Sequence, residues 1–276
     1  MLRLGSLNIR APAVMGILNV TPDSFSDGGR FDNPDVALRQ AVKMADAGAA
    51  IIDIGGESTR PGAKNVSEQQ ELDRVLPIIE SIRAVTEVPV SVDTSKPDVM
   101  RAAVAAGASM INDVYALRAA GAVAAAVELK VPVCLMHMRG QPRTMQDNPQ
   151  YDDVVAEVAA FLESRIEACV AAGFSEDLIV VDPGFGFGKT HDHNIELLAN
   201  LRQLRVRDRP MLVGVSRKST LGELTGRSIT ERVPASIAAA VVAVMQGADI
   251  IRAHDVQETV DALKVVRAIM ETGKNL

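Results

Sequence analysis

The stretch VMGILNVTPDSFSDGG, residues 14–29, sets the pattern that decides the fold of this chain. It is mostly apolar as far as Asn19, and a Thr-Pro-Asp-Ser turn then leads towards a pair of glycines. An apolar run that stops at Asn and Pro predicts a buried strand that opens into a long loop. Because a parallel strand covered on both faces needs no polar alternation, the run favours a parallel sheet. Such loops commonly carry function, and we expect residues 25–29 to act as a mobile lid.

The same succession of apolar run, polar strand end and helix occurs eight times along the chain. Eight parallel strands with right-handed crossovers predict one (β/α)8 TIM barrel over residues 1–276, in which residues 1–13 form a short extension, a hairpin or plug. An open doubly wound sheet is the alternative. The expected strands are residues 14–19, 50–54, 88–92, 109–111, 131–136, 178–181, 211–215 and 249–251. The main expected helices are residues 34–47, 67–83, 96–106, 119–129, 153–172, 194–204, 234–246 and 256–270.

The bulk composition narrows the class of protein. The chain has 276 residues, 47% hydrophobic content and a net charge of -6, which suits one large core and argues against nucleic acid as the main partner. No apolar run reaches the roughly 18 residues of a membrane span, and a signal peptide is not expected. Cys134 and Cys169 each lie in an apolar segment, which indicates buried free thiols and a reducing, cytoplasmic compartment.

Every expected strand ends at a polar residue. One such residue usually caps a helix or keeps a loop soluble, but eight in register predict a polar pocket at the mouth of the barrel, where the active sites of these barrels lie. The residues are Asn19, Asp53, Asp93, Asn112, His137, Asp182, Ser216 with Lys218, and Arg252 with His254.

Three of these residues form an acceptor-rich group, namely Asp93, Asn112 and Asp182. Helix capping is the simpler interpretation of each aspartate alone. As a group they suit a flat heterocycle with several N–H donors, because a carboxylate accepts two parallel N–H bonds and an amide matches a mixed edge.

The second group is cationic and predicts a phosphate or diphosphate guest, since arginine and lysine are the usual phosphate ligands. Ser219, at the expected start of the next helix, is placed to hold a carboxylate. The cationic residues are Arg60, Arg217, Lys218, Arg252 and His254.

The glycine-rich segment DPGFGFGK, residues 182–189, does not have the spacing of a P-loop. Its glycines allow a ligand close to the backbone, and Phe185 and Phe187 are expected to form a ligand wall. The histidines lack the spacing of a metal cage, and no motif indicates covalent catalysis.

The chain resembles the dihydropteroate synthase family of the folate pathway. The resemblance runs from Val14 to Val256 in the family's order. It is carried by GILNVTPDSFSDGG (16–29), IIDIGGESTRPGA (51–63), SVDTSKP (91–97), INDV (111–114), CLMHMRGQPRTMQ (134–146), DPGFGFGK (182–189), VGVSRKS (213–219) and IIRAHDV (250–256).

The resemblance implies a barrel transferase that is usually a homodimer and a sulfonamide target. Such an enzyme joins 4-aminobenzoate to 6-hydroxymethyl-7,8-dihydropterin diphosphate and releases 7,8-dihydropteroate and diphosphate. It also implies Mg2+ on the leaving group.

Carried onto this sequence, the family's site residues form three sets, and Asp93, Lys218, Arg252 and Arg60 are the implied catalytic residues. The pterin set is Asp93, Asn112, Met136, Asp182, Lys218 and Arg252. The diphosphate set is Asn19, Thr59, Arg60, Arg252 and His254, with Asn19 at the metal. The 4-aminobenzoate set is Thr59, Pro61, Phe187, Lys218 and Ser219.

The chemistry of these residues agrees with that reaction. Cations and Mg2+ assist departure of diphosphate, a carboxylate such as Asp93 stabilises the pterin cation that remains, and the amine attacks without a protein nucleophile. A mostly associative displacement fits the same residues. The alternative functions are a pterin-binding methyltransferase barrel and a non-catalytic pterin-binding paralogue.

Overall fold

The computed structural model describes residues 1–21, 34–58, 65–142 and 144–273. Within them, eight parallel strands lie in the order β8-β7-β6-β5-β4-β3-β10-β9. A parallel bridge between Val181 and Met211 joins β8 to β9, so the sheet curls round on itself. The predicted TIM barrel is therefore confirmed, and the open sheet was the wrong alternative. The strands are β3 (Ala13–Asn19), β4 (Ile51–Gly55), β5 (Val90–Asp93), β6 (Met110–Asp113), β7 (Val133–Met136), β8 (Ile179–Asp182), β9 (Leu212–Val213) and β10 (Ile250–Ala253).

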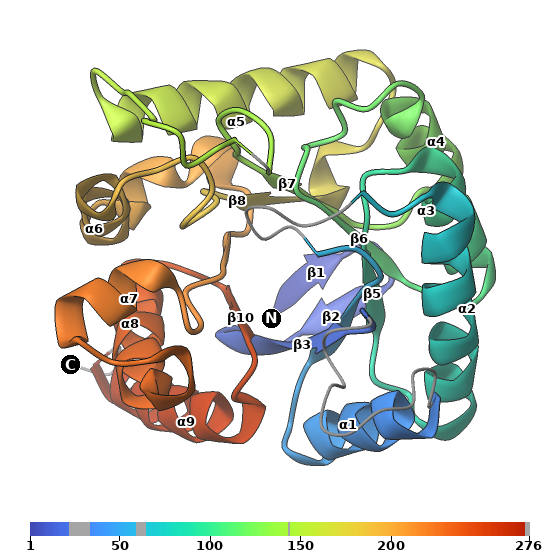
Figure 1. The fold of residues 1–276 in the computed structure, drawn as a ribbon, viewed down its shortest axis with the longest axis horizontal. Helices are drawn as coiled ribbons and strands as arrows, with labels where there is room; N and C mark the ends of the chain where they lie inside the picture. Colours follow the sequence, from blue (N-terminus) through green and yellow to red (C-terminus); the bar gives the residue numbers. More distant parts are fainter. Residues whose placement is uncertain (22–33, 59–64, 143, 274–276) are drawn as a thin grey trace.

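Helices surround the barrel in chain order, as Figure 1 shows in a view along the barrel. The expected helix over residues 194–204 is in fact α6 followed by a separate 3-10 turn, Leu201–Leu204. The helices are α1 (Pro34–Asp46), α2 (Glu68–Val85), α3 (Pro97–Ala105), α4 (Ala122–Leu129), α5 (Val154–Ala171), α6 (His191–Ala199), α7 (Ser219–Thr225), α8 (Val233–Met245) and α9 (Val256–Gly273).

Local signals in the sequence set several helix starts. Ser67 and Gln70 form a capping box, in which the Ser67 hydroxyl accepts the Gln70 N–H at 3.2 Å. Asp153 accepts the N–H of Ala156 at 2.9 Å and so begins α5. These bonds satisfy N–H groups that have no partner within the helix itself.

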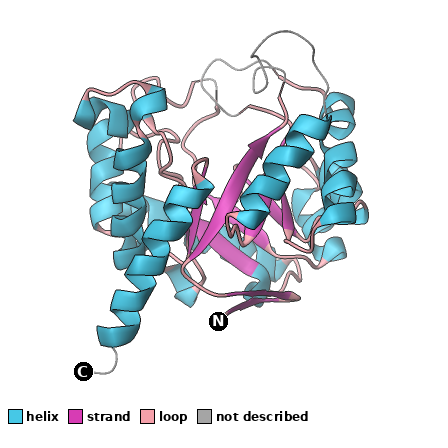
Figure 2. Cartoon of the chain, turned by 90° about the horizontal axis from the view of Figure 1, so that it is seen from below, coloured by secondary structure: helices cyan, strands magenta, loops and turns pink. Residues whose placement is uncertain are grey.

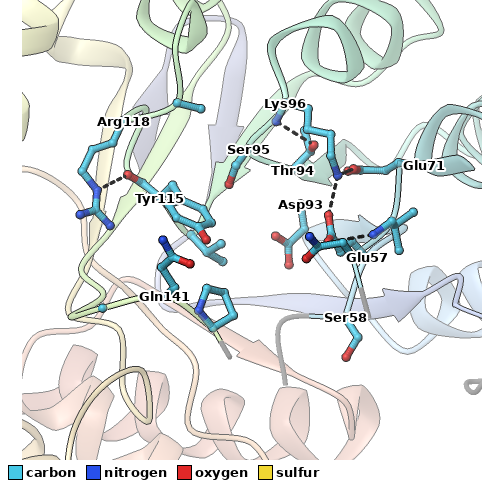
Figure 3. Close-up of a pocket in the computed structure, with 16 residues that line it drawn as sticks. Glu57, Ser58, Glu71, Asp93, Thr94, Ser95, Lys96, Tyr115, Arg118 and Gln141 are labelled. Carbon is cyan, nitrogen blue, oxygen red and sulfur yellow. Dashed lines mark hydrogen bonds and ion pairs between the residues drawn. The ribbon is translucent and has the colours of Figure 1, made fainter. Parts of the chain in front are cut away.

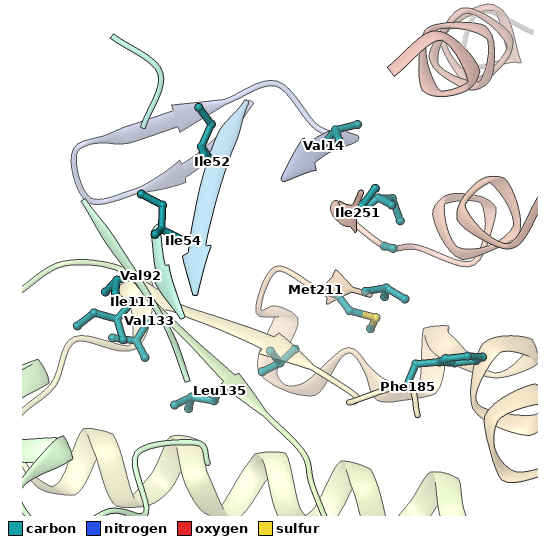
Figure 4. Close-up of a cluster of buried hydrophobic side chains, with 14 of the residues drawn as sticks. Val14, Ile52, Ile54, Val92, Ile111, Val133, Leu135, Phe185, Met211 and Ile251 are labelled. Carbon is teal, nitrogen blue, oxygen red and sulfur yellow. The ribbon is translucent and has the colours of Figure 1, made fainter. Parts of the chain in front are cut away.

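Apolar side chains fill two separate layers because side chains alternate along each strand. On β4, Ile52 and Ile54 point outward and pack under the helices, in the cluster that Figure 4 shows, whereas Ile51 points into the barrel. Asp53 therefore also faces the barrel interior. Cys134 and Cys169 are both buried and free, as expected.

The N-terminal residues close the bottom of the barrel. Strands β1 (Leu2–Leu4) and β2 (Leu7–Ile9) form an antiparallel hairpin. Leu4, Leu7 and Ile9 join the interior cluster with Met15 and other inward-facing strand residues. Figure 2 shows the hairpin across the end of the barrel from which the strands start. The opposite end, where the strands finish, is thus left for the polar residues.

None of the helices in the described part of the chain is both long and apolar enough to cross a membrane.

Candidate active site

The strand register sets several of the predicted polar residues beside neighbouring strand ends at the barrel mouth. Asn19 pairs with Gly55, Gly55 with Asp93, and Asp93 with Asn112 across neighbouring strands. Met136 pairs with Asp182 on the next two strands. Parallel strands end at the same edge, so residues distant in sequence meet here.

A charged network lies in the centre of the mouth and joins four strands. Arg252 donates from Nε to Asp53 Oδ2 at 2.7 Å and from Nη2 to Asp93 Oδ2 at 2.8 Å. Asn112 Nδ2 donates to the same Asp53 oxygen at 3.0 Å. Two carboxylates, one amide and one guanidinium are thereby fixed relative to one another.

Burial sets the protonation of this network. It raises the pKa of Asp93 to about 7, an effect that Asp53 strengthens and Arg252 opposes. Burial alone lowers the pKa of Arg252, but Asp53 and Asp93 outweigh that effect and raise it. Arg252 is therefore permanently charged, while Asp93 titrates near neutral pH.

Neither aspartate of the acceptor group caps a helix. The residue before α3 is Lys96, and α6 is capped by Thr190. Asp182 instead accepts the Gly184 N–H through Oδ1 at 2.7 Å, and burial raises its pKa to about 6. Both carboxyl groups thus lie at the mouth for a reason other than helix capping.

The glycine-rich segment after β8 is packed tightly on the segment after β7. Gly184 has φ +68°, and a Cβ there would lie 1.8 Å from the carbonyl oxygen of His137. This close approach accounts for a glycine at that position better than flexibility does. The segment's two phenylalanines differ, because Phe185 is buried in the outer core whereas Phe187 packs against the cluster around Met136. The expectation that Phe185 forms a ligand wall is therefore wrong.

Lys189 is a buried cation that the sequence did not single out. Its Nζ lies 2.8 Å from His137 Nδ1, 2.9 Å from the Gly184 carbonyl and 3.0 Å from the Phe187 carbonyl. Burial lowers the pKa of Lys189 to about 7 and, with the charge of Lys189, lowers the pKa of His137 to about 2. His137 is consequently neutral and accepts through Nδ1. The pair holds the segment that presents Phe187.

Lys218 lies beside Phe187, and Ser219 follows Lys218 in the chain. The Lys218 ammonium is 4.2 Å from the centre of the Phe187 ring. Ser219 is exposed and is the first residue of α7. An ammonium, an aromatic face and a hydroxyl are thus grouped at the edge of the mouth.

Two other members of the predicted cationic group, His254 and Arg217, have different partners in the structure. His254 Nδ1 lies 3.0 Å from the Ser216 hydroxyl at the ends of β10 and β9. Arg217 instead donates from Nε to Asp255 at 3.0 Å, and its charge is matched there. Its expected place in the cationic group at the mouth is therefore not supported. Thr59, Arg60, Pro61 and the expected lid, residues 25–29, lie outside the described residues.

A cavity of about 620 Å³ opens over β5 and β6 and includes Asp93 in its lining. Figure 3 shows Lys96 between Glu57 and Glu71 on one side of it, and Tyr115 and Arg118 on the other. Lys96 forms ion pairs with both glutamates. Sequence reasoning did not select this triad, although Glu57 and Lys96 stand within the quoted GGESTRPGA and DTSKP motifs.

The oxygen donors at the mouth are of the kind that a hard cation such as Mg2+ prefers. No group of three or more His, Cys, Asp or Glu residues forms a metal cage in the described ranges. A Cβ at Gly55 would lie 3.7 Å from Asn19 Oδ1 and 3.8 Å from Asp93 Oδ2, so both oxygens border the same small space. Mg2+ usually takes one or two protein oxygens together with phosphate and water.

Comparison with known proteins gives consistent matches. Residues 15–254 match the family model described as pterin binding enzyme. The dihydropteroate synthase of Escherichia coli K12 is 52% identical over 270 residues, 98% of this chain and 96% of that protein.

Two solved structures are similar throughout. One is Yersinia pestis dihydropteroate synthase in a sulfonamide drug complex, with TM-score 0.93, 52% identity, and 98% of this chain and 99% of that chain covered. The other is Xanthomonas albilineans dihydropteroate synthase in complex with 7,8-dihydropteroate, with TM-score 0.88, 50% identity, and 96% and 95% covered.

Proposed function

Since this chain belongs to the dihydropteroate synthase family of pterin-binding enzymes, we propose that the polar residues at its barrel mouth bind and activate the substrates of that reaction. The enzyme condenses 6-hydroxymethyl-7,8-dihydropterin diphosphate with 4-aminobenzoate and forms 7,8-dihydropteroate and diphosphate. The observation that carries the assignment of the site is the network of Arg252 with Asp53, Asp93 and Asn112 in the centre of the mouth.

The pterin occupies the acceptor-rich part of the mouth. Asp182 has one carboxylate oxygen bound to Gly184, and the other is available to the N–H groups of the heterocycle. Asn112 offers its carbonyl oxygen, because its amino group is directed to Asp53. Arg252 presents a planar cation for stacking, and Met136 supplies an apolar wall.

The diphosphate lies at the ends of β3 and β10. Arg252 and His254 neutralise the charge that develops on the leaving oxygen, and Arg60 is assigned to the same task from the sequence motif. Mg2+, held by Asn19 and the diphosphate, would supply Lewis-acid stabilisation of that leaving group. Asp93 is placed to stabilise positive charge on the pterin methylene as the bond to oxygen breaks.

The 4-aminobenzoate lies on the side of Lys218. Its ring packs beside Phe187, whose own face is covered by the Lys218 ammonium, and its carboxylate binds near Ser219. Thr59 and Pro61 complete this set from the sequence motif. The amine then attacks the methylene directly, because the reaction needs no protein nucleophile.

A secondary isotope effect at the pterin methylene tests whether bond breaking precedes attack. We expect a normal effect on the chemical step, because the methylene carbon gains trigonal character as diphosphate leaves. A negligible effect would instead indicate the associative displacement, which the same residues permit.

We further propose that the protein works in the cytoplasm as a homodimer. Two buried free cysteines are compatible with a reducing compartment. Exposed apolar side chains on α8 and α9 favour these helices as the contact between subunits, with Met245 50%, Val265 61% and Ile269 62% exposed.

Diphosphate release is the decisive assay. The purified protein is incubated with the pterin diphosphate, with and without 4-aminobenzoate and Mg2+, and diphosphate is measured by a coupled enzyme. We expect release that depends on both additions. No release with all components present would contradict the function. Transfer of a methyl group from methyltetrahydrofolate would indicate the methyltransferase alternative, and binding of pterin without turnover would indicate the paralogue.

A further inference from the structure

Asp53 lies beneath the proposed pterin site and touches two of its residues. It is fully buried and faces the barrel interior from β4. Its Oδ2 atom accepts both Arg252 Nε at 2.7 Å and Asn112 Nδ2 at 3.0 Å. Neither the family resemblance nor the reaction chemistry above gives Asp53 a role of its own.

We propose that Asp53 is a positioning residue that fixes the hydrogen-bonding polarity of the pterin pocket, an inference that rests on the proposed function. A carboxylate only accepts hydrogen bonds, so Asn112 must turn its amino group towards Asp53 and its carbonyl oxygen away from it. The same carboxylate holds the guanidinium of Arg252 through Nε. Asp53 thereby selects a heterocycle edge that donates to Asn112, and it aligns the cation over which the ring stacks.

The geometry of Asp53 favours this role over one in stability. Its second oxygen, Oδ1, is buried and has no hydrogen-bond partner among the described residues. A buried carboxylate with an unpaired oxygen lowers stability, and its replacement by a neutral group of equal shape often costs little. Its placement is better explained by the two groups it orients.

Asp53 also acts on Asp93 through Arg252. The charged and titratable groups that face Asp93 are Arg252 on β10, Asp53 on β4, Glu71 on α2 and Asp113 on β6. The negative charge of Asp53 raises the pKa of Asp93. Removal of that charge leaves the existing pair of Arg252 Nη2 and Asp93 Oδ2, 2.8 Å apart, without the opposing effect of Asp53, so the pKa of Asp93 falls.

The test compares Asp53→Asn with Asp249→Asn. Asp249 is a matched control, because it also accepts from an arginine, Arg205 Nη2 at 2.8 Å, and from a second N–H, that of Met211 at 2.9 Å. It precedes β10, at the end of the barrel away from the mouth. Calorimetry gives the dissociation constant of 6-hydroxymethyl-7,8-dihydropterin from pH 5 to 9, and thermal unfolding reports stability.

We expect Asp53→Asn to fold and to bind the pterin roughly 10–100-fold more weakly. The variant loses the charged hydrogen bond to Arg252 and no longer fixes the direction of the Asn112 amide. The midpoint of its pH dependence should move to lower pH, whereas the KM for 4-aminobenzoate should stay the same. Asp249→Asn should lower the unfolding temperature and leave pterin affinity and midpoint unchanged. Equal pterin affinity and midpoint in Asp53→Asn and the wild type would overturn the inference.

Diphosphate release by the wild-type protein shows whether the role of Asp53 or the proposed function as a whole is wrong. If the wild-type protein releases diphosphate and Asp53→Asn binds pterin as well as it does, only the role of Asp53 fails. If the wild-type protein neither binds pterin nor releases diphosphate, the function fails first. A similar loss of pterin affinity in Asp249→Asn would show that general destabilisation is the cause, and would also overturn the inference.

Discussion

Asp182 stands at the last position of β8 with one carboxylate oxygen held by the Gly184 N–H at 2.7 Å. We predict that Asp182→Ala abolishes detectable pterin binding in calorimetry, because the alanine leaves the N–H donors of the heterocycle without an acceptor. Ser219→Ala is the matched comparison at the other subsite. It should raise the KM for 4-aminobenzoate and leave pterin affinity unchanged. A selective loss of pterin affinity in Ser219→Ala would mean that the two subsites are misassigned.

The raised pKa of Asp93 predicts how the contribution of this single residue to stability changes with pH. Burial raises its pKa from the ordinary 3.8 to about 7, so between these values the folded state binds more protons than the unfolded state. Its contribution to stability is therefore lost as the pH rises from about 4 to 7. The unfolding free energy of the wild type minus that of Asp93→Asn should fall over this window in urea titrations. A difference that does not change with pH would contradict the raised pKa.

The sequence predicted the position of some residues at the mouth but not that of Arg217. Asp93, Asn112, Asp182 and Arg252 were each expected directly after a buried strand. Strand pairing aligns Asp93 with Asn112, and the side chain of Arg252 reaches Asp93 from β10. Arg217 was misplaced because a positive φ of 57° and the nearby Asp255 carboxylate decide where its side chain goes. Neither the backbone angle nor the partner could be inferred from the pattern of residues.

At the scale of elements, Lys96 joins two loops and a helix. It forms ion pairs with Glu57 after β4 and with Glu71 on α2, and the latter side chain is only 1% exposed. Glu57 also accepts the Val66 N–H at 3.3 Å, so it connects the two sides of the segment between β4 and α2. The triad thus connects the end of β4 to α2 and to the residue before α3.

We predict that Lys96→Met lowers the unfolding free energy by about 2–3 kcal/mol, because it leaves the buried Glu71 carboxylate without its cation. Adding Glu71→Gln should recover part of that loss, since the double variant buries no unpaired charge. Chemical denaturation of the four proteins in this cycle provides the measurement. Strictly additive losses would show that the two side chains are not coupled.

The N-terminal hairpin is expected to contribute to stability but not to activity. Leu7 is buried in the interior cluster, whereas Asn8, the next residue on β2, is exposed. Leu7→Ala should lower the unfolding free energy by about 2–4 kcal/mol through the cavity it leaves, and Asn8→Ala should change it little. Diphosphate release by folded Leu7→Ala should stay near that of the wild type, because the hairpin lies at the end of the barrel away from the mouth. Equal stability of both variants would contradict a plug.

For the whole molecule, the exposed apolar side chains of α8 and α9 predict a subunit contact. Replacing both Val265 and Ile269 by Asp should convert the proposed dimer into a monomer in analytical ultracentrifugation, because burial of two charges disfavours association. Val170→Asp on α5 is the control, since Val170 is also an exposed apolar residue, 38% exposed, on another helix. A wild-type protein that sediments as a monomer would refute the dimer.

The sequence by itself determined the repeating strand–helix order, the barrel and the polar residues at the strand ends, because hydrophobic periodicity and chain connectivity are local properties. Only the tertiary structure decided three other features. They are the different packing of Phe185 and Phe187, the burial of Lys189 and the hydrogen bonds of Asp53. Each depends on which side chain arrives from another strand or loop. In the stretch from Val14, the sequence predicted the strand and its polar end at Asn19. Only the register between β3, β4 and β5 set Asn19 beside Gly55, with Asp93 on the next strand.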